Sequence, residues 1–522
     1  MEITSFYFLI FYACVLLVYY LVPAKHRWLV LVAAGAFFYA GSVDGGGLLT
    51  FFNHFMGDGR AAEPEIIPGL IPGPGVLRAE ALAFLYPLAA LTAGYTGALA
   101  VSRGKHRGAA LTVTLLVLFG VLTAVKYLRF GTGAAVPLGI SFYTFSVAGY
   151  CIDVYNGLSE PIRNPLRLAL YAFYFPLLIS GPIVNRKESG AAFDEPHRFD
   201  YRQVTFGMQR MVWGFFKKLV IAERAGIVAS TVFGNYEQYP GTYIWIGALM
   251  FTVQLYADFS GCMDIVLGLS ETFGIVLPEN FHLPFLAKSI SEYWRRWHIT
   301  LGVWMRNCVF YPLLRTRLFT GLDRKLRAKL GRKKGKQLNT HIAMFFLWLT
   351  VGLWHGGAMK YVIGSGLLHW LYIVTGEWTL PFFTALFGRL HIPMKGKAAD
   401  AFRVARTFLL VNIGNVFFRA DSVPSALGML KGAVTVFNPG VLFDGSLFGL
   451  GLDWIDMGVL AVSVVILIAV SLANEKKPVR ERVAAKPLPL RWAAYFALLF
   501  YVILLGNYGP GYSAAEFIYQ GF

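Results

Sequence analysis

The stretch ITSFYFLIFYACVLLVYYLV, residues 3–22, decides the fold class of this chain. It carries no charged side chain and has about the 20 residues that an α-helix needs to cross a bilayer. Further apolar runs follow at 28–52, 79–101, 109–126, 206–232, 240–258, 454–474 and 491–506. The alternation of apolar and polar residues that indicates strands is absent from these runs, so helices are expected to satisfy the backbone. The sequence therefore predicts an all-α polytopic membrane protein with about 11–13 membrane helices or re-entrant segments.

The charged residues are concentrated in short loops between the apolar runs. Of the 522 residues, 56% are hydrophobic and only 15% are charged, yet the formal net charge is +18. Basic stretches at 102–108, 323–336 and 474–486 are expected to face the cytoplasm, and the neutral or acidic stretches 57–75 and 438–453 the outside. Membrane orientation thus explains the charge better than nucleic-acid binding does. The loop 323–336 could also contact lipid phosphates or an acidic cytosolic partner.

Polar residues are distributed unevenly, but without an indication of separate domains. A central block at 134–376 holds the densest mixture of Trp, Arg, Asp, Asn and His among apolar residues. The flanking regions 1–133 and 377–522 have the plain, periodic composition of scaffold helices. We expect a single membrane domain over 1–522, with the central block as its functional core.

Two histidines stand in tryptophan-flanked, membrane-like sequence: His298 in WRRWHITLGVW and His355 in LTVGLWHGG. An ionisable side chain is costly inside a bilayer, so it is a functional candidate by default. The apolar helix that ends at His355 has only about 15 residues, which reach roughly 22 Å of the roughly 30 Å hydrocarbon thickness. We expect His355 to lie within the membrane depth, just before the break at Gly356-Gly357. Structural hydrogen bonding is the alternative for both rings.

The histidines suggest acid-base chemistry. A desolvated histidine favours its neutral ring, which can accept the proton of an attacking hydroxyl as a general base. The sequence has no G-x-S-x-G serine elbow, no H-E-x-x-H zinc motif and no Walker A loop. We therefore expect neither a bound metal nor a bound cofactor.

Two carboxylates, Asp258 and Asp264 in YADFSGCMD, stand in another apolar run. We expect them to anchor helix packing by pairing with Arg295 or Arg296, in preference to a direct chemical role.

Several motifs together resemble the membrane-bound O-acyltransferase family. They are DFSGCMDIVLGLSETFGIVLPENFHLPFLAKSISEYWRRWHITLGVWMRNCVFYPL at 258–313, PLGISFYTFSVAGYCIDVYNG at 137–157, ISGPIV at 179–184 and GLWHG at 352–356. The similarity is greatest to the bacterial branch whose members act in alginate O-acetylation and in D-alanyl transfer to teichoic acid. Relatives usually carry Asp where Asn307 stands, and a Gly-Gly pair where this chain has Leu313-Leu314-Arg315.

The resemblance implies a ring of helices around a thin central catalytic region that funnels from both faces reach. It also implies that His355 is the catalytic base and His298 an auxiliary residue. Candidates for the substrate tunnel, or for contacts with the histidines, are Trp354, Trp297, Arg295, Arg296, Asp258, Ser260 and Asn280.

The expected function is O-acyl transfer in a bacterial plasma membrane. The acyl group, in the first place acetyl, would pass from a cytosolic thioester across the membrane to a cell-surface polysaccharide such as alginate. The donor would be acetyl-CoA or an acyl carrier thioester. The partners would be membrane lipid and an extracytoplasmic acetyltransferase-like or acceptor protein. The length of the chain favours the polysaccharide O-acetylation branch over the D-alanyl transfer branch.

Two alternatives stay open. One is D-alanyl transfer toward teichoic acid, with a cytosolic acyl carrier protein docking on the basic loop 323–336. The other is a transporter or channel whose histidines line a solute path.

Overall fold

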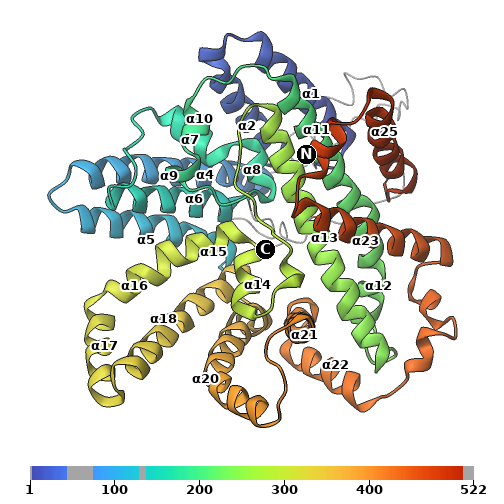
Figure 1. Ribbon diagram of the computed structural model, residues 1–522. Helices are drawn as coiled ribbons and strands as arrows, with labels where there is room; N and C mark the ends of the chain where they lie inside the picture. The colour runs from blue at the N-terminus through green and yellow to red at the C-terminus, as the bar shows by residue number, and fades with distance from the viewer. Residues whose placement is uncertain (1–2, 44–73, 129–136, 509–522) are drawn as a thin grey trace. The chain divides into compact units, whose positions relative to one another are not determined.

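The computed structural model describes residues 3–43, 74–128 and 137–508 (Figure 1). Every regular element within these ranges is helical, and the one β-type pairing there is an isolated antiparallel bridge between Phe281 and Trp297. The prediction of an all-α chain is confirmed. Residues 44–52 of the second apolar run and 57–73 of the expected outer loop lie outside the described ranges.

Two compact units make up the chain. The N-terminal unit comprises 1–208 and 266–278, and the C-terminal unit comprises 209–265 and 279–522. Both tryptophan-flanked histidines belong to the C-terminal unit. The single membrane domain expected from the sequence stays a prediction.

The N-terminal unit is a group of packed helices. Its elements are α1 (Phe6–Leu21), η1 (Ala24–His26), α2 (Arg27–Val43), α4 (Pro74–Arg103), α5 (Arg107–Lys126), α6 (Ile140–Tyr155), α7 (Pro165–Phe173), α8 (Phe175–Ser180), α9 (Arg186–Ser189) and α10 (Ala191–Asp194). Helix α4 packs against α5 and α6, and α2 packs against α7. Buried tyrosines of α1 donate hydrogen bonds to the last residue of α13 (Thr242–Thr272) and to the residue after it. The Tyr12 hydroxyl lies 3.1 Å from Thr272 Oγ1, and the Tyr19 hydroxyl 2.9 Å from the Phe273 carbonyl oxygen.

The C-terminal unit contains the rest of the helices. After α11 (Tyr201–Phe215), which begins in the N-terminal unit, they are η2 (Phe216–Ala222), α12 (Glu223–Gly234), α13, η3 (Pro284–Leu286), α14 (Ile290–Arg296), α15 (Ile299–Met305), η4 (Arg306–Phe310), α16 (Tyr311–Arg315), α17 (Arg317–Leu330), α18 (Arg332–His355), α19 (Met359–Tyr361), η5 (Val362–Leu367), α20 (Leu368–Arg389), α21 (Lys397–Arg419), α22 (Val423–Thr435), η6 (Pro439–Leu442), η7 (Ser446–Leu450), α23 (Trp454–Asn474), α24 (Val479–Ala484) and α25 (Leu488–Leu505). Helices α17 and α18 form a hairpin, and α18 also packs against η5 (Figure 1).

Five of the described helices are long and apolar enough to cross a membrane: Phe84–Arg103 within α4, then α5, α21, α23 and α25. Helix α1 is a shorter apolar helix. The apolar runs at 79–101, 109–126, 454–474 and 491–506 therefore correspond to α4, α5, α23 and α25. Helix α21 was not among the predicted runs, because Arg403 and Arg406 break the apolar pattern in its first half.

The predicted run 206–232 is not one regular helix. It is divided into α11, the π-helical segment η2 and α12, and the charged Lys217, Lys218, Glu223 and Arg224 are buried within it. The close approach of α11 to α13 depends on glycine, because a Cβ atom at Gly214 would lie 2.6 Å from the Gly261 carbonyl oxygen. A π turn holds more residues than an α turn, so the two adjacent lysines of η2 can both reach α13.

The partners of the two α13 carboxylates differ from the prediction. Lys218 Nζ lies 2.7 Å from Asp258 Oδ1, and Lys217 Nζ lies 2.5 Å from Asp264 Oδ2. Asp264 also pairs with Arg210, whose Nε lies 2.9 Å from Oδ1. The carboxylates thus anchor helix packing, as expected.

The expected pairing of these carboxylates with Arg295 or Arg296 was wrong. Arg295 is exposed, and Arg296 instead pairs with Glu292 of its own helix at 2.7 Å. Arg296 also donates a hydrogen bond to the Leu283 carbonyl oxygen at 3.3 Å, so it bridges its own helix and the segment before η3.

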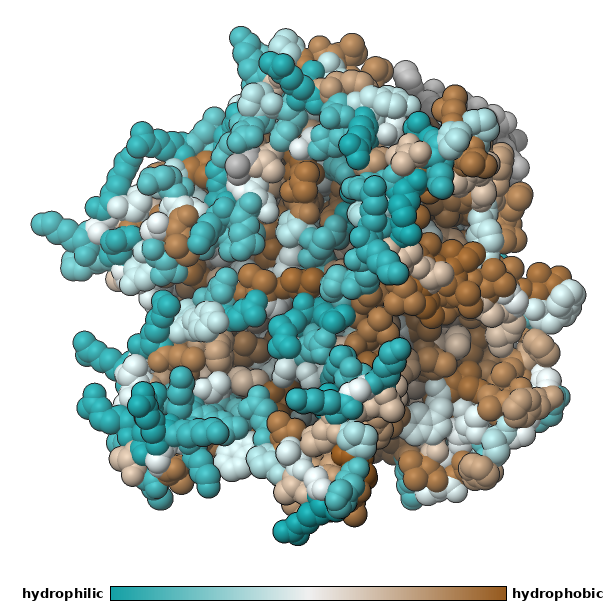
Figure 2. All heavy atoms as spheres, in the orientation of Figure 1, coloured by the Kyte–Doolittle hydropathy of each residue, from teal (hydrophilic) through white to brown (hydrophobic). Residues whose placement is uncertain are grey.

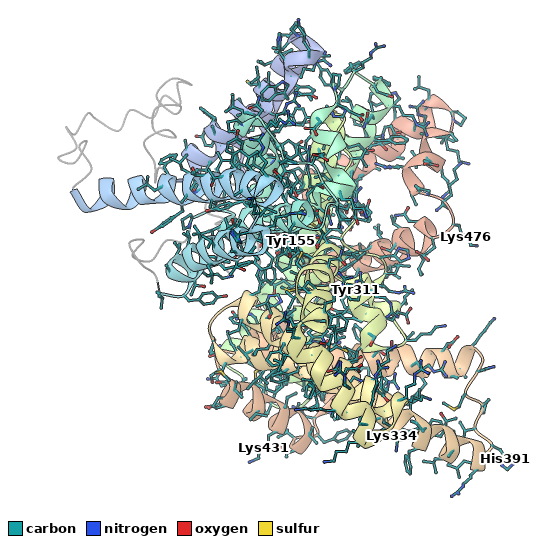
Figure 3. All side chains as sticks on the ribbon, turned by 90° about the vertical axis from the view of Figure 1, so that its left-hand side faces the viewer. Tyr155, Tyr311, Lys334, His391, Lys431 and Lys476 are labelled. Carbon is teal, nitrogen blue, oxygen red and sulfur yellow. The ribbon has the colours of Figure 1, made fainter. Side chains whose placement is uncertain are left out.

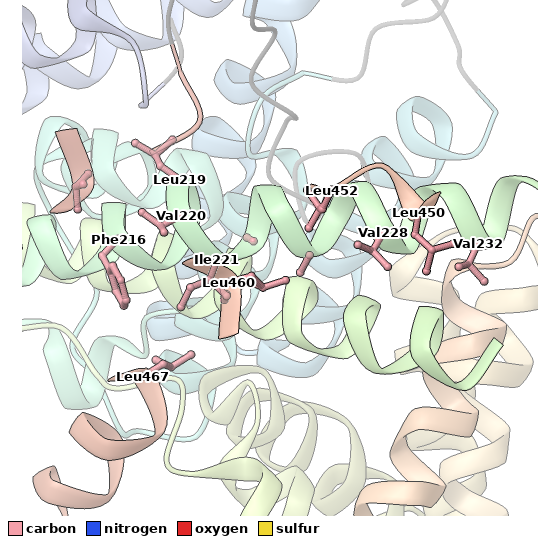
Figure 4. Close-up of a cluster of buried hydrophobic side chains, with 14 residues drawn as sticks. Phe216, Leu219, Val220, Ile221, Val228, Val232, Leu450, Leu452, Leu460 and Leu467 are labelled. Atoms are coloured by element: carbon pink, nitrogen blue, oxygen red, sulfur yellow. The ribbon is translucent and has the colours of Figure 1, made fainter. Parts of the chain in front are cut away.

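An apolar cluster holds η2 and α12 against the C-terminal helices (Figure 4). Phe216, Val220 and Ile221 of η2 and Val232 of α12 lie in it together with Leu467 of α23. Each of these side chains is buried. Close packing of this kind loses contacts at once when a methyl or phenyl group is removed.

The basic residues of α17 and of the turn that follows it form hydrophilic surface. The face that carries α17 and the following turn is hydrophilic in Figure 2, whereas the surface over α23 is largely apolar. Figure 3 shows Lys334, in the first turn of α18, and Lys476, after α23, on the same side of the unit, with Lys431 of α22 on the other. The cytoplasmic placement of the loops 323–336 and 474–486 stays a prediction.

Candidate active site

His355 is the last residue of α18. Gly356 follows with a φ of 150°, a conformation that favours glycine, and ends the helix. Helix α18 approaches η5 closely at Gly352, where a Cβ atom would lie 2.7 Å from Val362 Cα. His355 is 2% exposed, and its ring meets the Phe418 ring of α21 edge to face, with centroids 5.4 Å apart. As predicted, a glycine break directly follows this histidine.

His298 lies between α14 and α15 in a left-handed backbone conformation, with φ 46° and ψ 54°. For a residue other than glycine such a conformation costs on the order of 1–3 kcal/mol, so the surroundings must hold it. Two backbone hydrogen bonds do so, from His282 N–H to the Arg296 carbonyl at 2.9 Å and from Ile299 N–H to the Asn280 carbonyl at 3.0 Å. They flank the bridge between Phe281 and Trp297.

The Asn280 side chain fixes the orientation of the His298 ring. Its Oδ1 atom accepts hydrogen bonds from Thr300 N–H at 3.0 Å and from the Thr300 hydroxyl at 2.9 Å, and lies 3.3 Å from His298 Nδ1. A backbone N–H can only donate, so this atom is the amide oxygen and can only accept. His298 Nδ1 therefore carries the proton, and Nε2 carries the lone pair of the neutral ring.

The environment of His298 keeps its ring neutral. The side chain lies outside the five candidate spans, and its burial lowers the pKa to about 3. Phe259 of α13 covers the ring edge to face, with centroids 4.8 Å apart. At neutral pH the ring can thus accept a proton or a hydrogen bond through Nε2.

The Trp354 ring contacts the rings of both histidines. Its ring centroid lies 5.7 Å from that of His298 and 4.7 Å from that of His355. The structure therefore brings together two histidines that are far apart in the sequence, with a buried indole ring as their common neighbour. Such aromatic surroundings exclude water and strengthen the electrostatic interactions of any bound polar group.

The other candidate residues differ in their surroundings. Trp297 is buried and stacks on Tyr293, with centroids 5.7 Å apart. Ser260 accepts a hydrogen bond from Lys217 Nζ at 3.0 Å, and Asp258 pairs with Lys218. Their roles in a substrate tunnel stay predictions, as do those of Arg295 and Arg296.

Two features of the site were missed. The ring of Phe418 contacts His355 from a helix that the apolar pattern did not predict. Lys217 and Lys218, which bind the α13 carboxylates, were visible as charges within the apolar run 206–232, and that was a usable signal. Within the described residues, no three His, Cys, Asp or Glu side chains are placed so that they could hold a metal ion.

Comparison with known proteins places these features in a family. Residues 162–402, which include His298, Trp354 and His355, match the model of MBOAT, the membrane-bound O-acyltransferase family. The chain is 31% identical over 434 residues to the probable alginate O-acetylase AlgI of Azotobacter vinelandii. The matched region covers 79% of this chain and 73% of the Azotobacter protein.

Two further relatives match over shorter lengths. The probable alginate O-acetylase AlgI of Pseudomonas syringae pv. tomato is 35% identical over 307 residues, 59% of this chain and 53% of that one. The teichoic acid D-alanyltransferase of Bacillus subtilis is 28% identical over 242 residues, 44% of this chain and 56% of that one. This chain therefore spans about half the length of each of these two relatives. Together with the Azotobacter match, these similarities establish that the chain belongs to the membrane-bound O-acyltransferase family.

Proposed function

We propose that this integral membrane protein transfers an acetyl group from a cytosolic thioester to hydroxyl groups of a cell-surface polysaccharide, and that it does so in a bacterial plasma membrane. Family membership supports acyl transfer to a hydroxyl. The alginate O-acetylase names of two relatives support acetyl as the acyl group and a polysaccharide as the acceptor. The observation that carries the proposal is the placement of His298 and His355 against the same buried tryptophan.

In the proposed reaction His355 is the general base. Its neutral ring accepts the hydroxyl proton while the acceptor oxygen attacks the thioester carbonyl carbon. The new C–O bond forms, the C–S bond breaks, and the imidazolium returns the proton to the departing thiolate. A thioester is reactive, so a base and correct positioning are sufficient for the protein to supply.

His298 is the auxiliary residue in this proposal. Because Asn280 holds the proton on Nδ1, the Nε2 atom can accept a hydrogen bond from a substrate hydroxyl or amide. Trp354 then separates and orients the two rings. The donor is acetyl-CoA or an acyl carrier thioester, and the acetyl group passes on to an extracytoplasmic acetyltransferase-like protein or directly to the acceptor.

The D-alanyl alternative has less support. The D-alanyltransferase relative shares 28% identity over 44% of the chain, against 31% over 79% for the Azotobacter protein. The basic α17–α18 hairpin fits an acidic carrier protein by charge, and a carrier could equally deliver an acetyl group. A transporter or channel would show solute uptake in liposomes without acyl transfer.

The experiment is complementation in a bacterium from which its own alginate O-acetylation membrane protein has been deleted. Wild-type protein should restore O-acetyl ester on the secreted polysaccharide, and His355→Ala should not, at equal protein levels in the membrane. His106→Ala is the matched control, because this histidine is exposed in a loop and should be dispensable. Full acetylation by His355→Ala would contradict the assignment of the base. Restoration of D-alanyl ester instead of acetyl ester would favour the alternative.

A further inference from the structure

A pocket of the C-terminal unit lies outside the histidine cluster. Its volume is about 690 Å³, within the roughly 300–1,000 Å³ range of small-ligand sites. One wall is formed by the end of α11, η2, α13 and the segment 279–283, and the other by α23, α24 and α25. The second wall lies outside the residues 162–402 that match the family model, so the pocket depends on helices beyond the matched region.

The pocket is apolar along its walls and charged at one end. Its apolar lining comes from Trp213, Phe216, Ile466, Leu467, Val470, Ala497, Leu498 and other residues of the same helices. The charged end carries Glu279, Glu475, His282 and Arg480. His282 Nε2 lies 3.3 Å from Glu475 Oε1, and both side chains are about half exposed, at 60% and 44%.

The charges contributed by α11, η2, α13 and Glu279 pair with one another. Arg210 directs Nε to Asp264 at 2.9 Å and its two terminal nitrogens to Glu279 at 2.8 and 2.6 Å. Lys217 binds Asp264 and the Ser260 hydroxyl. These groups therefore leave no net charge that an anionic ligand would have to balance.

The charged lining as a whole is also balanced. The lining cations are Arg210, Lys217 and Arg480, and the lining carboxylates are Asp264, Glu279 and Glu475. The three positive and three negative charges cancel, and both signs occur near the exposed end of the pocket. A head group that carries both an ammonium and a phosphate matches this arrangement better than a purely anionic one.

The second wall of the pocket is formed by helices that face the lipid of the membrane. Helices α23 and α25 are candidate spans, and only 17% and 6% of their apolar windows are buried inside the protein. The surface over α23 is apolar (Figure 2), and Lys476, in the basic stretch that follows α23, marks the interfacial end (Figure 3). The charged end of the pocket thus lies where this helix leaves the apolar region, at the level of lipid head groups.

We propose that this pocket binds a membrane phospholipid with a zwitterionic, amino-bearing head group. The ammonium group is held by Glu475, the phosphate by Arg480, and the acyl chain lies between η2 and the helices α23 and α25. Asn280 and Met263 also line the pocket, and the Asn280 side chain orients the His298 ring. The pocket is therefore adjacent to the histidine cluster through Asn280. The inference does not depend on the acyl-transfer proposal.

The test is native mass spectrometry of the full-length protein purified in detergent, with phosphatidylethanolamine and phosphatidylglycerol as the two probes. Wild-type protein should retain one phosphatidylethanolamine at least about tenfold more strongly than phosphatidylglycerol, a ratio that corresponds to about 1.4 kcal/mol. Ala497→Trp fills the pocket and should reduce this retention about tenfold or more. Ala493→Trp, on the same helix but outside the lining, is the matched control and should retain the lipid.

A second variant keeps the pocket volume and changes its charge. Glu475→Lys removes the acceptor of the ammonium group, so the preference should shift toward phosphatidylglycerol. Equal retention of the two lipids by wild-type protein would mean surface lipid only and would overturn the proposal. Undiminished phosphatidylethanolamine on Ala497→Trp would place the lipid elsewhere and overturn it as well. Acetyl transfer is not part of either readout.

Discussion

Replacing Asn280 with alanine or with aspartate separates the two effects of its side-chain oxygen. In Asn280→Ala, the Thr300 N–H and the Nδ1–H of His298 both lose the acceptor that they share, at 3.0 and 3.3 Å. The Thr300 hydroxyl can rotate toward another acceptor, so its loss should cost little. A buried donor without its acceptor costs about 1–3 kcal/mol, so the free energy of unfolding should fall by about 2–6 kcal/mol.

Asn280→Asp keeps an acceptor oxygen at the same position. It should therefore lose less stability than Asn280→Ala, even though its contact with Met263 Sδ is weakened. The added carboxylate favours the protonated ring of His298 and raises its pKa. Acyl transfer should therefore begin to fall at a higher pH than in the wild-type protein, because a protonated Nε2 can no longer accept a hydrogen bond.

The assay compares denaturant unfolding of the two variants in detergent and their acyl transfer in membranes at several pH values. For Asn280→Asp, activity should recover as the pH is raised, since the ring loses its added proton. Two results would refute the reasoning: an unfolding free energy of Asn280→Ala within about 0.5 kcal/mol of wild type, the usual range of surface substitutions, or equal destabilisation by both variants.

Three further predictions concern stability and packing. Burial lowers the pKa of His298 from 6.5 to about 3, so between these pH values the unfolded chain binds more protons than the folded protein. The midpoint of denaturant unfolding should therefore drop as the pH falls through this window. It should drop less in His298→Gln. Asp264→Ala leaves Lys217 and Arg210 without their shared carboxylate and should cost about 3–5 kcal/mol in denaturant unfolding, whereas Asp400→Ala, which removes an exposed pair with Lys288, should cost at most about 1 kcal/mol; equal costs would contradict the buried network. Gly352→Ala forces α18 away from η5 and should lower acyl transfer at normal membrane levels; unchanged activity would show that this close approach does not position His355.

The helices that the sequence predicted well are those whose structure is decided locally. The apolar runs of α4, α5, α23 and α25 are long enough to form spans by themselves, so length and composition were sufficient. His355 was correctly placed directly before a break, because the Gly356-Gly357 pair is a local signal for the end of a helix.

The features that the sequence did not predict depend on contacts between distant segments. Neighbouring residues such as Lys217 and Lys218 point to different faces of an α-helix, so the apolar pattern did not predict that both lie within the π-helical η2 and bind α13. The left-handed conformation of His298 is unusual for a residue that is not glycine, and the pairing of 280–282 with 296–299 enforces it. Phe418 approaches His355 through the packing of α21, which periodicity does not reveal.

The central claim, that His355 is the base of an acetyl transfer across the membrane, can be measured in inverted membrane vesicles. Labelled acetyl thioester is added to the cytosolic face, and acetyl ester is measured on polysaccharide enclosed within the vesicles. The account predicts that wild-type vesicles accumulate the ester and that His355→Ala lowers the rate at least about 100-fold, the lower end of the contribution of a general base. A His355→Ala rate within a few-fold of wild type would contradict it.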